Sequence, residues 1–236
     1  MFKLIRESLD DILWPAVIVM FFWVTFFVNL TYGYNWHDLG IRPRSLVGLR
    51  GVVFSPFLHG DFGHLFSNSI PFLVSGGFIF HFWKKISWQL LGLMWFFSGF
   101  PVWLYAKPYT THIGASGVVY AMIFFVFVSG LIRKNRNLSA IAMLLIFLYG
   151  GLIWGLFPQI TKSGTLISWE GHMAGAITGL ILAFVFREKG PEDDKDFEDD
   201  NEPPPQWWLE SDETLREQNT TIRYHFRPGP EETTDD

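Results

Sequence analysis

The chain has 236 residues, of which 49% are hydrophobic and only 17% are charged, with 25 Phe and 11 Trp. Soluble domains carry about 25% charged residues, so this composition argues against a soluble domain and indicates an integral membrane protein. The absence of cysteine excludes disulfides, thiolate chemistry and cysteine-based metal sites, and the net charge of −5 comes from one end of the chain.

Six apolar stretches predict the membrane-spanning elements, in chain order 13–32, 64–83, 86–105, 115–132, 138–157 and 169–187. Each is close to the ~20 residues needed to cross ~30 Å of hydrocarbon. Because lipid offers the backbone no hydrogen-bond partners, we predict helices rather than strands. The first stretch follows Lys3 and Arg6, but it is too long for a signal-peptide core and lacks a small-residue cleavage site, so we expect an uncleaved span.

The basic residues predict that both termini are cytoplasmic. With the N-terminus inside, the inner segments carry nine Lys and Arg and the outer loops carry five, which fits the usual excess of positive charge on the cytoplasmic side. Three of the five, Arg42, Arg44 and Arg50, lie in the long outer loop 33–63. That loop is too apolar for a solvated linker, so we expect it to be folded onto the membrane surface.

Charge and proline content divide the chain into three expected parts. Residues 1–12 are a cytoplasmic N-terminus, 13–187 a six-helix membrane domain and 188–236 a cytoplasmic tail. The tail holds 17 of the 23 acidic residues, and its composition cannot bury enough apolar surface to order itself. Two interpretations of Trp207-Trp208-Leu209 stay open, a short docking motif or part of a disordered tail.

Polar residues that lipid should exclude gather at the beginnings of the second, fourth and sixth stretches. In the expected topology these three helices start at the outer face, and they open with His64 and Asn68, with Ser116, and with His172. About 17 residues separate Ser116 from the cytoplasmic Arg133, or ~25 Å of helix, which is less than the ~30 Å core. Ser116 is therefore expected to lie below the outer surface, in a cavity open to water.

The segment Gly114-Ala115-Ser116-Gly117 places a serine at a helix start between two glycines. Free backbone N–H groups there could stabilise an oxyanion, and the glycines would let a substrate backbone come close. An N-cap serine or a small-residue packing face would explain the same residues.

His172 begins a helix in which Gly175 and Gly179 follow at i+3 and i+7, so the histidine lies at the top of a small-residue face. Gly117 and Ala121 offer the matching surface on the fourth helix. Close contact of these faces would bring His172 within reach of the Ser116 hydroxyl. The alternative is a structural histidine that bonds a neighbouring carbonyl.

His64 and Asn68 are spaced i, i+4, so both can point into one cavity and donate hydrogen bonds to a developing oxyanion. His59 lies five residues before His64, in the connecting loop. Three histidines could instead converge on a metal ion, but no carboxylate or cysteine joins them. We therefore expect no metal.

Three motifs together resemble the signatures of the rhomboid family of intramembrane serine proteases. They are His59-x4-His64-x3-Asn68, then Gly114-Ala115-Ser116-Gly117-Val118-Val119-Tyr120, and Gly171-His172-Met173-Ala174-Gly175-x3-Gly179. The resemblance covers about residues 13–187 and implies an all-α, six-transmembrane-helix bundle with a membrane-associated first outer loop.

The resemblance implies a role for each matching residue. Ser116 would be the nucleophile, and His172 would be its general base and later the acid that protonates the leaving amine. His64 and Asn68, with the Ser116 backbone N–H, would form the oxyanion hole. Tyr120 would stack on the His172 ring. His59 would have a supporting role and hold the first loop. The fifth helix would be the gate of the active site, and the loop from Pro158 to Trp169 would be its cap.

The resemblance also implies partners. The substrates would be single-pass transmembrane proteins, cleaved in or near the membrane segment after a small residue, with no cofactor and no nucleic acid. The expected location is the membrane, as a multi-pass protein of a bacterial plasma membrane. A non-enzymatic adaptor of the same fold is the alternative, although such relatives usually lack the serine or the histidine. A transporter is disfavoured because the polar groups lie toward one face rather than at the midplane.

Overall fold

The computed structural model of the protein describes residues 2–134, 136–148, 153–158 and 168–190. The described residues fall in the unit Met1–Asp194, and a second unit, Lys195–Asp236, lies outside them. Helices and turns make up the described part. Its one strand-like pairing is an isolated antiparallel bridge between Ile41 and His112. The all-helical expectation is therefore confirmed over these residues.

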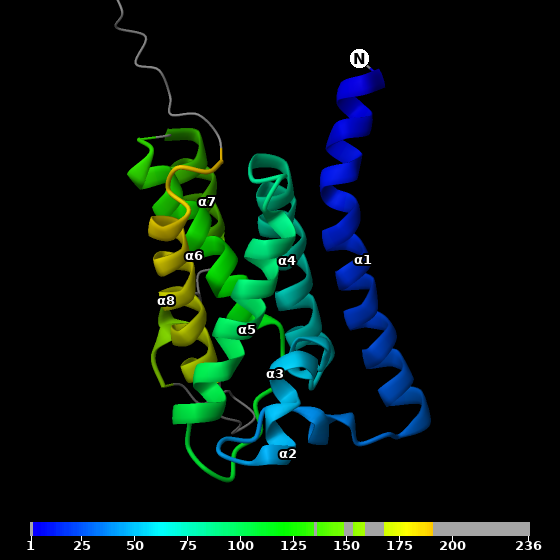
Figure 1. Ribbon diagram of the computed structural model, residues 1–236. Helices are drawn as coiled ribbons and strands as arrows, with labels where there is room; N and C mark the ends of the chain where they lie inside the picture. The colour runs from blue at the N-terminus through cyan, green and yellow to red at the C-terminus, as the bar shows by residue number, and fades with distance from the viewer. Residues whose placement is uncertain (1, 135, 149–152, 159–167, 191–236) are drawn as a thin grey trace, which may run out of the picture. The chain divides into compact units, whose positions relative to one another are not determined.

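A long helix lies in each of the six predicted stretches (Figure 1). They are α1 (Phe2–Tyr32), α4 (Phe62–Phe82), α5 (Ser87–Tyr105), α6 (Ser116–Ile132), α7 (Arg136–Leu148) and α8 (Trp169–Val185). The beginnings of α4 and α6 agree with the sequence to within two residues. Of the apolar stretch 138–157, α7 is described through Leu148, and the 3-10 turn η3 (Trp154–Leu156) lies in its last part.

The first outer loop is folded into four short helices, η1 (Trp36–Leu39), α2 (Leu46–Leu49), α3 (Gly51–Phe54) and η2 (Ser55–Phe57). It is tied to α5 by indole hydrogen bonds from Trp103 to the Ser45 carbonyl (2.9 Å) and from Trp95 to the Val53 carbonyl (3.1 Å). Its outer side exposes apolar side chains, with Leu46 85% exposed. Such a surface is suited to contact with lipid rather than water.

Length and hydropathy identify two described helices, Asp11–Tyr32 and Phe62–Phe82, that could each cross a bilayer without help. Both α6 and α8 are apolar but have only 17 residues. At 1.5 Å per residue each is about 25 Å long, so a bilayer around them would have to thin or the ends of the helices would lie below its surface. The 17-residue length of α6 agrees with the length on which the expectation of a Ser116 below the outer surface was based.

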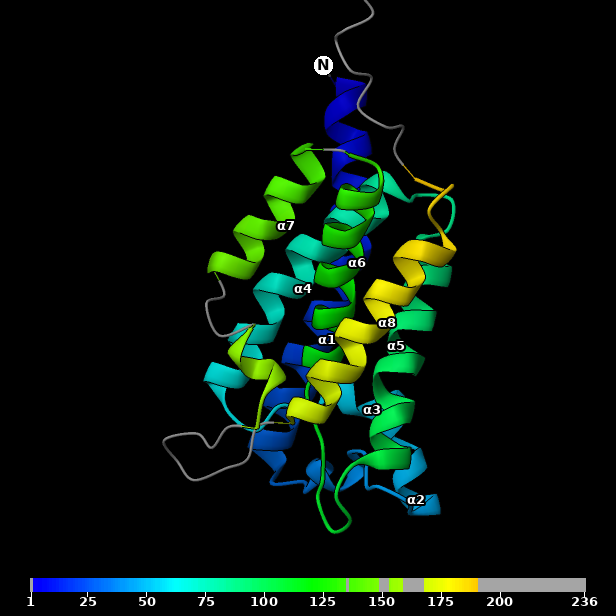
Figure 2. The ribbon, with the colours of Figure 1, turned by 90° about the vertical axis from the view of Figure 1, so that its left-hand side faces the viewer.

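The helix α6 lies at the centre of the bundle and packs against α4, α5, α7 and α8. Its contact with α8 is the most extensive, and the two helices lie side by side in both views of the ribbon (Figure 1 and Figure 2). A Cβ at Gly175 would collide with the Gly117 carbonyl oxygen, and one at Gly179 with the Ala121 carbonyl oxygen. The small-residue face expected on the sixth helix is therefore what lets the two backbones touch.

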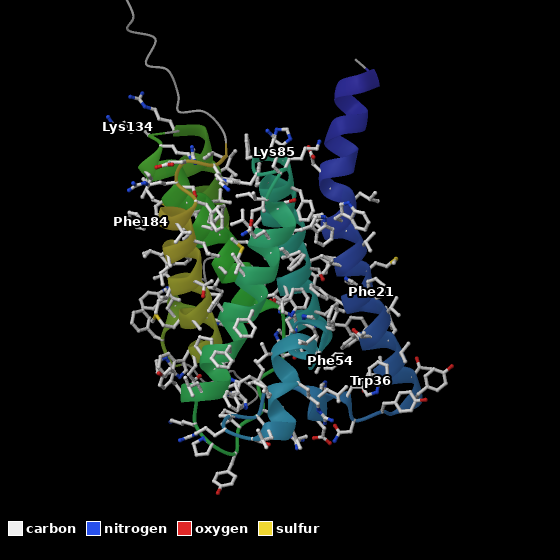
Figure 3. The ribbon with its side chains drawn as sticks, viewed as in Figure 1. Phe21, Trp36, Phe54, Lys85, Lys134 and Phe184 are labelled. Atoms are coloured by element: carbon white, nitrogen blue, oxygen red, sulfur yellow. The ribbon has the colours of Figure 1, made fainter. Side chains whose placement is uncertain are left out.

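The two ends of the bundle differ in charge. Lys85 and Lys134 lie at the end where α1 begins, whereas Trp36 and the first loop lie at the opposite end (Figure 3). At the lysine end, the buried Asp11 of α1 accepts from His81 (2.8 Å) and Lys84 (3.2 Å) and so links α1 to α4. Arg133 donates to the carbonyl of Lys189 (2.7 Å) just beyond α8, where a cation stabilises the negative end of the helix.

Candidate active site

Ser116 is the first residue of α6, and the backbone before it takes a special conformation. Gly114 has φ +106, a region that residues with a side chain rarely adopt, and a Cβ there would overlap the imidazole of His64. Glycine is therefore required at this position for two reasons. It turns the chain into the helix, and it brings His64 against the segment that carries Ser116.

His172 is held at both ring nitrogens. Its Nε2 lies 2.8 Å from Ser116 Oγ and its Nδ1 lies 2.8 Å from the Gly155 carbonyl oxygen. A carbonyl oxygen can only accept, so Nδ1 carries the hydrogen and Nε2 presents its lone pair to the serine hydroxyl. This tautomer is the one that can remove the hydroxyl proton.

The faces of the His172 ring are also fixed, because the Tyr120 ring stacks on it with centroids 4.3 Å apart and an angle of 7°. The imidazole is 8% exposed. Gly155 must be a glycine for its carbonyl to come so near, since a Cβ would collide with the Tyr120 hydroxyl and lie 3.0 Å from Nδ1 of His172. Gly155 was missed by the sequence reasoning because it contributes a backbone atom rather than a side chain.

A small cavity reaches Ser116 from between the first loop, α5 and α8. It has ≈ 30 Å³ of room for the centres of water molecules, enough for about two waters. Its polar lining comes from His112 and four serines, and the rest is mostly apolar or glycine; the serines are Ser55, Ser98, Ser116 and Ser168. The cavity can therefore hold water next to the serine while remaining too small for a bulky side chain.

His64 and Asn68 lie on one face of α4, with the Asn68 amide donating to the His64 carbonyl oxygen (2.8 Å). The His64 backbone N–H is capped by the Asp61 side chain (2.8 Å). Neither His64 nor Asn68 lines the cavity that contains Ser116. One amide hydrogen of Asn68 and the imidazole of His64, which contacts Gly114, are the groups that could turn toward a negative oxygen there.

His59 is 2% exposed, and both of its ring nitrogens are buried with no hydrogen-bond partner among the described residues. Its ring packs against those of Phe22 (5.4 Å) and His64 (5.0 Å). Burial and the neighbouring His64 lower the pKa of His59 to about 3, so it is neutral at pH 7. Over the described part of the chain, no third His, Cys, Asp or Glu completes a group that could hold a metal.

Two expected segments, the cap over the site and the C-terminal tail, lie largely outside the described residues. The expected cap, from Pro158 to Trp169, consists mostly of residues 159–167, which are outside the described residues. Of the expected tail, 188–236, only residues 188–190 are described. Of the gate helix, α7 is described through Leu148.

Comparison with known families decides the relationship. The model of the rhomboid domain matches residues 48–189, which include α4, α5, α6 and α8 together with Ser116 and His172. The chain belongs to the rhomboid family. Rhomboid proteins are membrane proteins, and the family consists largely of intramembrane serine proteases, although some members are inactive.

Several bacterial relatives are similar to this rhomboid. The uncharacterized protein Rv1337 of Mycobacterium tuberculosis is 36% identical over 155 residues, which is 62% of each chain. The uncharacterized protein ML1171 of Mycobacterium leprae is 33% identical over 180 residues, 72% of this chain and 70% of the relative. The match thus spans about three-fifths of the length of the M. tuberculosis relative.

A viral protein is also similar. A protein of Acanthamoeba polyphaga mimivirus, whose name assigns it provisionally to the rhomboids, is 32% identical over 139 residues, covering 55% of this chain and 71% of the viral one.

Proposed function

We propose that this rhomboid is an active intramembrane serine endopeptidase that cleaves single-pass transmembrane proteins within or next to their membrane segment. The observation that supports this most is the bonding of His172. One ring nitrogen donates to the Gly155 carbonyl and the other accepts from Ser116 Oγ, each at 2.8 Å. A serine and a histidine in this arrangement are an activated nucleophile and its general base.

In the first half of the proposed reaction, Ser116 Oγ attacks the carbonyl carbon of the scissile peptide while its proton passes to His172 Nε2. The C–N bond then breaks, and the proton on Nε2 moves to the departing amine. This leaves the acyl group esterified to Ser116. In the second half, a water gives one proton to Nε2 while its hydroxyl bonds to the acyl carbon. The bond from this carbon to Ser116 Oγ then breaks and Oγ takes the proton back from Nε2, which releases the carboxylic acid and restores both side chains.

The Gly155 carbonyl takes the place that an acidic residue holds in many serine hydrolases. It fixes the tautomer of neutral His172, and when His172 carries both protons it accepts the Nδ1–H. Stacking on Tyr120 limits rotation of the ring. The dyad is therefore oriented without a buried carboxylate.

The oxyanion would be stabilised by the Ser116 backbone N–H at the start of α6, with His64 and Asn68 as side-chain donors. The first N–H groups of a helix have no partner within it and carry partial positive charge. The contact between His64 and Gly114 places an imidazole against the segment that leads into this helix start.

The proposed topology has six membrane crossings between residues 13 and 187, with both termini and the tail 188–236 in the cytoplasm of a bacterial cell. The lysines at the end of the bundle where α1 begins support this orientation (Figure 3). Ser116 then lies toward the outer face, at the depth that the 17-residue α6 imposes.

The alternative is a rhomboid-like adaptor that binds transmembrane helices without cleaving them. The experiment that separates the two is reaction of the detergent-solubilised protein with a fluorophosphonate, together with cleavage of a model transmembrane substrate. We expect labelling and cleavage by the wild-type protein, and neither by Ser116→Ala or His172→Ala proteins that still insert in the membrane. Cleavage by Ser116→Ala at the wild-type rate would overturn the proposal.

A further inference from the structure

A second pair of serine and histidine side chains joins the same two segments as the first. His112 Nδ1 lies 2.6 Å from Ser168 Oγ, four residues before the pair Ser116 and His172 on both segments. The residue types are exchanged, with the histidine now on the loop before α6 and the serine at the start of α8. Two hydrogen bonds between side chains, of 2.6 and 2.8 Å, therefore connect these segments.

The hydrogens of this second pair can be assigned from its neighbours. Thr110 Oγ1 donates to the Lys107 carbonyl (2.6 Å), so at its 2.9 Å contact with His112 Nε2 it has to accept. His112 Nε2 then carries the hydrogen, and Nδ1 accepts the hydroxyl hydrogen of Ser168. These hydrogen bonds run from Ser168 through His112 and Thr110 to the Lys107 carbonyl. Every hydrogen in the series has an acceptor when His112 is neutral.

The surroundings of His112 keep it neutral. Its side chain is buried, and its backbone is paired with Ile41 through two hydrogen bonds of 2.9 Å. Burial lowers the pKa of His112 below its ordinary value, while Glu170 in the first turn of α8 opposes this in part. Among the described residues Glu170 is the charged group that acts on this ring, and Ile41, Thr110 and Ser168 present uncharged atoms to it.

Ser168 occupies the N-cap position of α8, but its side chain caps none of the helix N–H groups. An N-cap serine ordinarily accepts from an N–H of the first turn. Here the hydroxyl is bonded to His112 instead, while the Ser168 backbone carbonyl accepts from the N–H of Gly171 (3.1 Å) and of His172 (3.3 Å). Ser168 is thus bonded through its hydroxyl to His112 and through its carbonyl to the turn that carries His172.

We propose that His112 is a positioning residue, which through Ser168 holds the first turn of α8 at the distance that lets His172 reach Ser116. This inference rests on the proposed function, because it assigns His112 a part in keeping the dyad assembled. His112 itself touches neither residue of the dyad by hydrogen bonding in the described structure. It acts on the reaction through the helix.

Two near-isosteric substitutions of His112 test its hydrogen bond to Ser168 and its hydrogen bond to Thr110 one at a time. In His112→Asn the amide oxygen can stand where Nδ1 stood and still accept from Ser168, whereas in His112→Gln the amide nitrogen can stand where Nε2 stood and still donate to Thr110. We expect His112→Asn to keep kcat within about 3-fold and His112→Gln to lose about 10- to 100-fold, since a displacement near 1 Å can cost ~10²-fold. KM should be little changed in both.

Ser168→Ala and Thr110→Val test the same two bonds from the other side. Ser168→Ala should match His112→Gln, and Thr110→Val should match His112→Asn. These variants leave the imidazole in place, so they still decide the question if both substitutions of His112 fail to fold. Equal kcat values for Ser168→Ala and Thr110→Val would overturn the proposal.

A readout independent of proteolysis distinguishes failure of this inference from failure of the proposed function. Hydrogen exchange of the Gly171 and His172 amides should be at least about 10-fold faster in Ser168→Ala than in the wild-type protein and unchanged in Thr110→Val. If the wild-type protein cleaves nothing but shows this pattern, the proposed function fails and the link from His112 to α8 stands. If exchange is the same in both variants, the positioning role is refuted whatever the activity.

Discussion

The carbonyl oxygen of Gly155 accepts a hydrogen bond from Nδ1 of His172 at 2.8 Å. A backbone atom of η3 therefore sets the tautomer of a ring whose other nitrogen faces Ser116. The turn η3 that carries Gly155 follows α7 in the chain, whereas His172 lies in the first turn of α8, so correct placement of η3 is a condition for the proposed activity.

Gly155→Ala should lower kcat by ~10²-fold with little change in KM, because the added Cβ would push the carbonyl away from His172 and strike the Tyr120 hydroxyl. The measurement is steady-state cleavage of a model transmembrane substrate. Gly92→Ala on α5 is the matched control, since a Cβ there meets nothing within 4 Å. Equal kcat for the two variants would show that the carbonyl does not orient the histidine.

Gly175→Ala should destabilise the α6–α8 contact by about 1–3 kcal/mol or more. The new Cβ would meet the Gly117 carbonyl oxygen, a backbone atom that cannot rotate aside. Thermal unfolding in detergent should show a lower Tm than that of the wild-type protein. The Gly92→Ala protein should unfold at or slightly above the wild-type temperature, because alanine favours the helix.

The sequence predicted the long helices and the closeness of Ser116 to His172 because each rests on a local pattern. Apolar length gave the long helices, and the i, i+3, i+7 spacing of His172, Gly175 and Gly179 indicated the face that packs on α6. The Gly155 carbonyl and the bond from His112 to Ser168 could not be predicted in this way. The first involves a backbone atom, and the second joins residues 56 positions apart with no repeating pattern between them.

The turn η3 and the four short helices of the first loop were also not predicted. Composition alone extends the fifth helix to residue 157, whereas Trp154–Leu156 form the 3-10 turn that presents the Gly155 carbonyl. In the first loop, tertiary bonds from Trp95 and Trp103 hold segments that are too short to be stable helices alone. Such bonds become visible only once α5 is placed.

Asn68→Ala should reduce turnover by about 10²–10³-fold if Asn68 donates to the oxyanion. Its amide also donates to the His64 carbonyl, so a loss of stability has to be separated from a loss of rate. The kcat of folded protein, counted by fluorophosphonate active-site titration, makes that separation. A variant with wild-type kcat would move the oxyanion role to His64 and the Ser116 N–H.

Acidification should destabilise the protein through His59. Its pKa falls from 6.5 in the unfolded chain to about 3 in the folded one, so between these values the unfolded chain binds more protons. The free energy of unfolding is therefore highest above pH 6.5 and decreases as the pH falls toward 3. His59→Leu should make Tm less dependent on pH across this window than it is in the wild-type protein.

The last prediction is that no carboxylate takes part in catalysis, so Glu170→Gln should remain active. The Nδ1 hydrogen of His172, which a triad acid would accept, already goes to the Gly155 carbonyl. Asp61 caps the His64 N–H at the start of α4, and Asp38 accepts from Arg42 at an exposed site. The negative charge of Glu170 raises the pKa of His112, against the larger lowering caused by burial.

Asp38 and Asp61 therefore have other partners, and among the described residues none of the three acids is hydrogen-bonded to Ser116 or His172. The test is the cleavage rate of Glu170→Gln, Asp61→Asn and Asp38→Asn proteins that insert and fold. We expect each to stay within about 10-fold of wild type, because asparagine can still cap α4 and an exposed ion pair contributes little. A loss of ~10⁴-fold in any one, as when a true triad acid is neutralised, would replace the dyad with a triad.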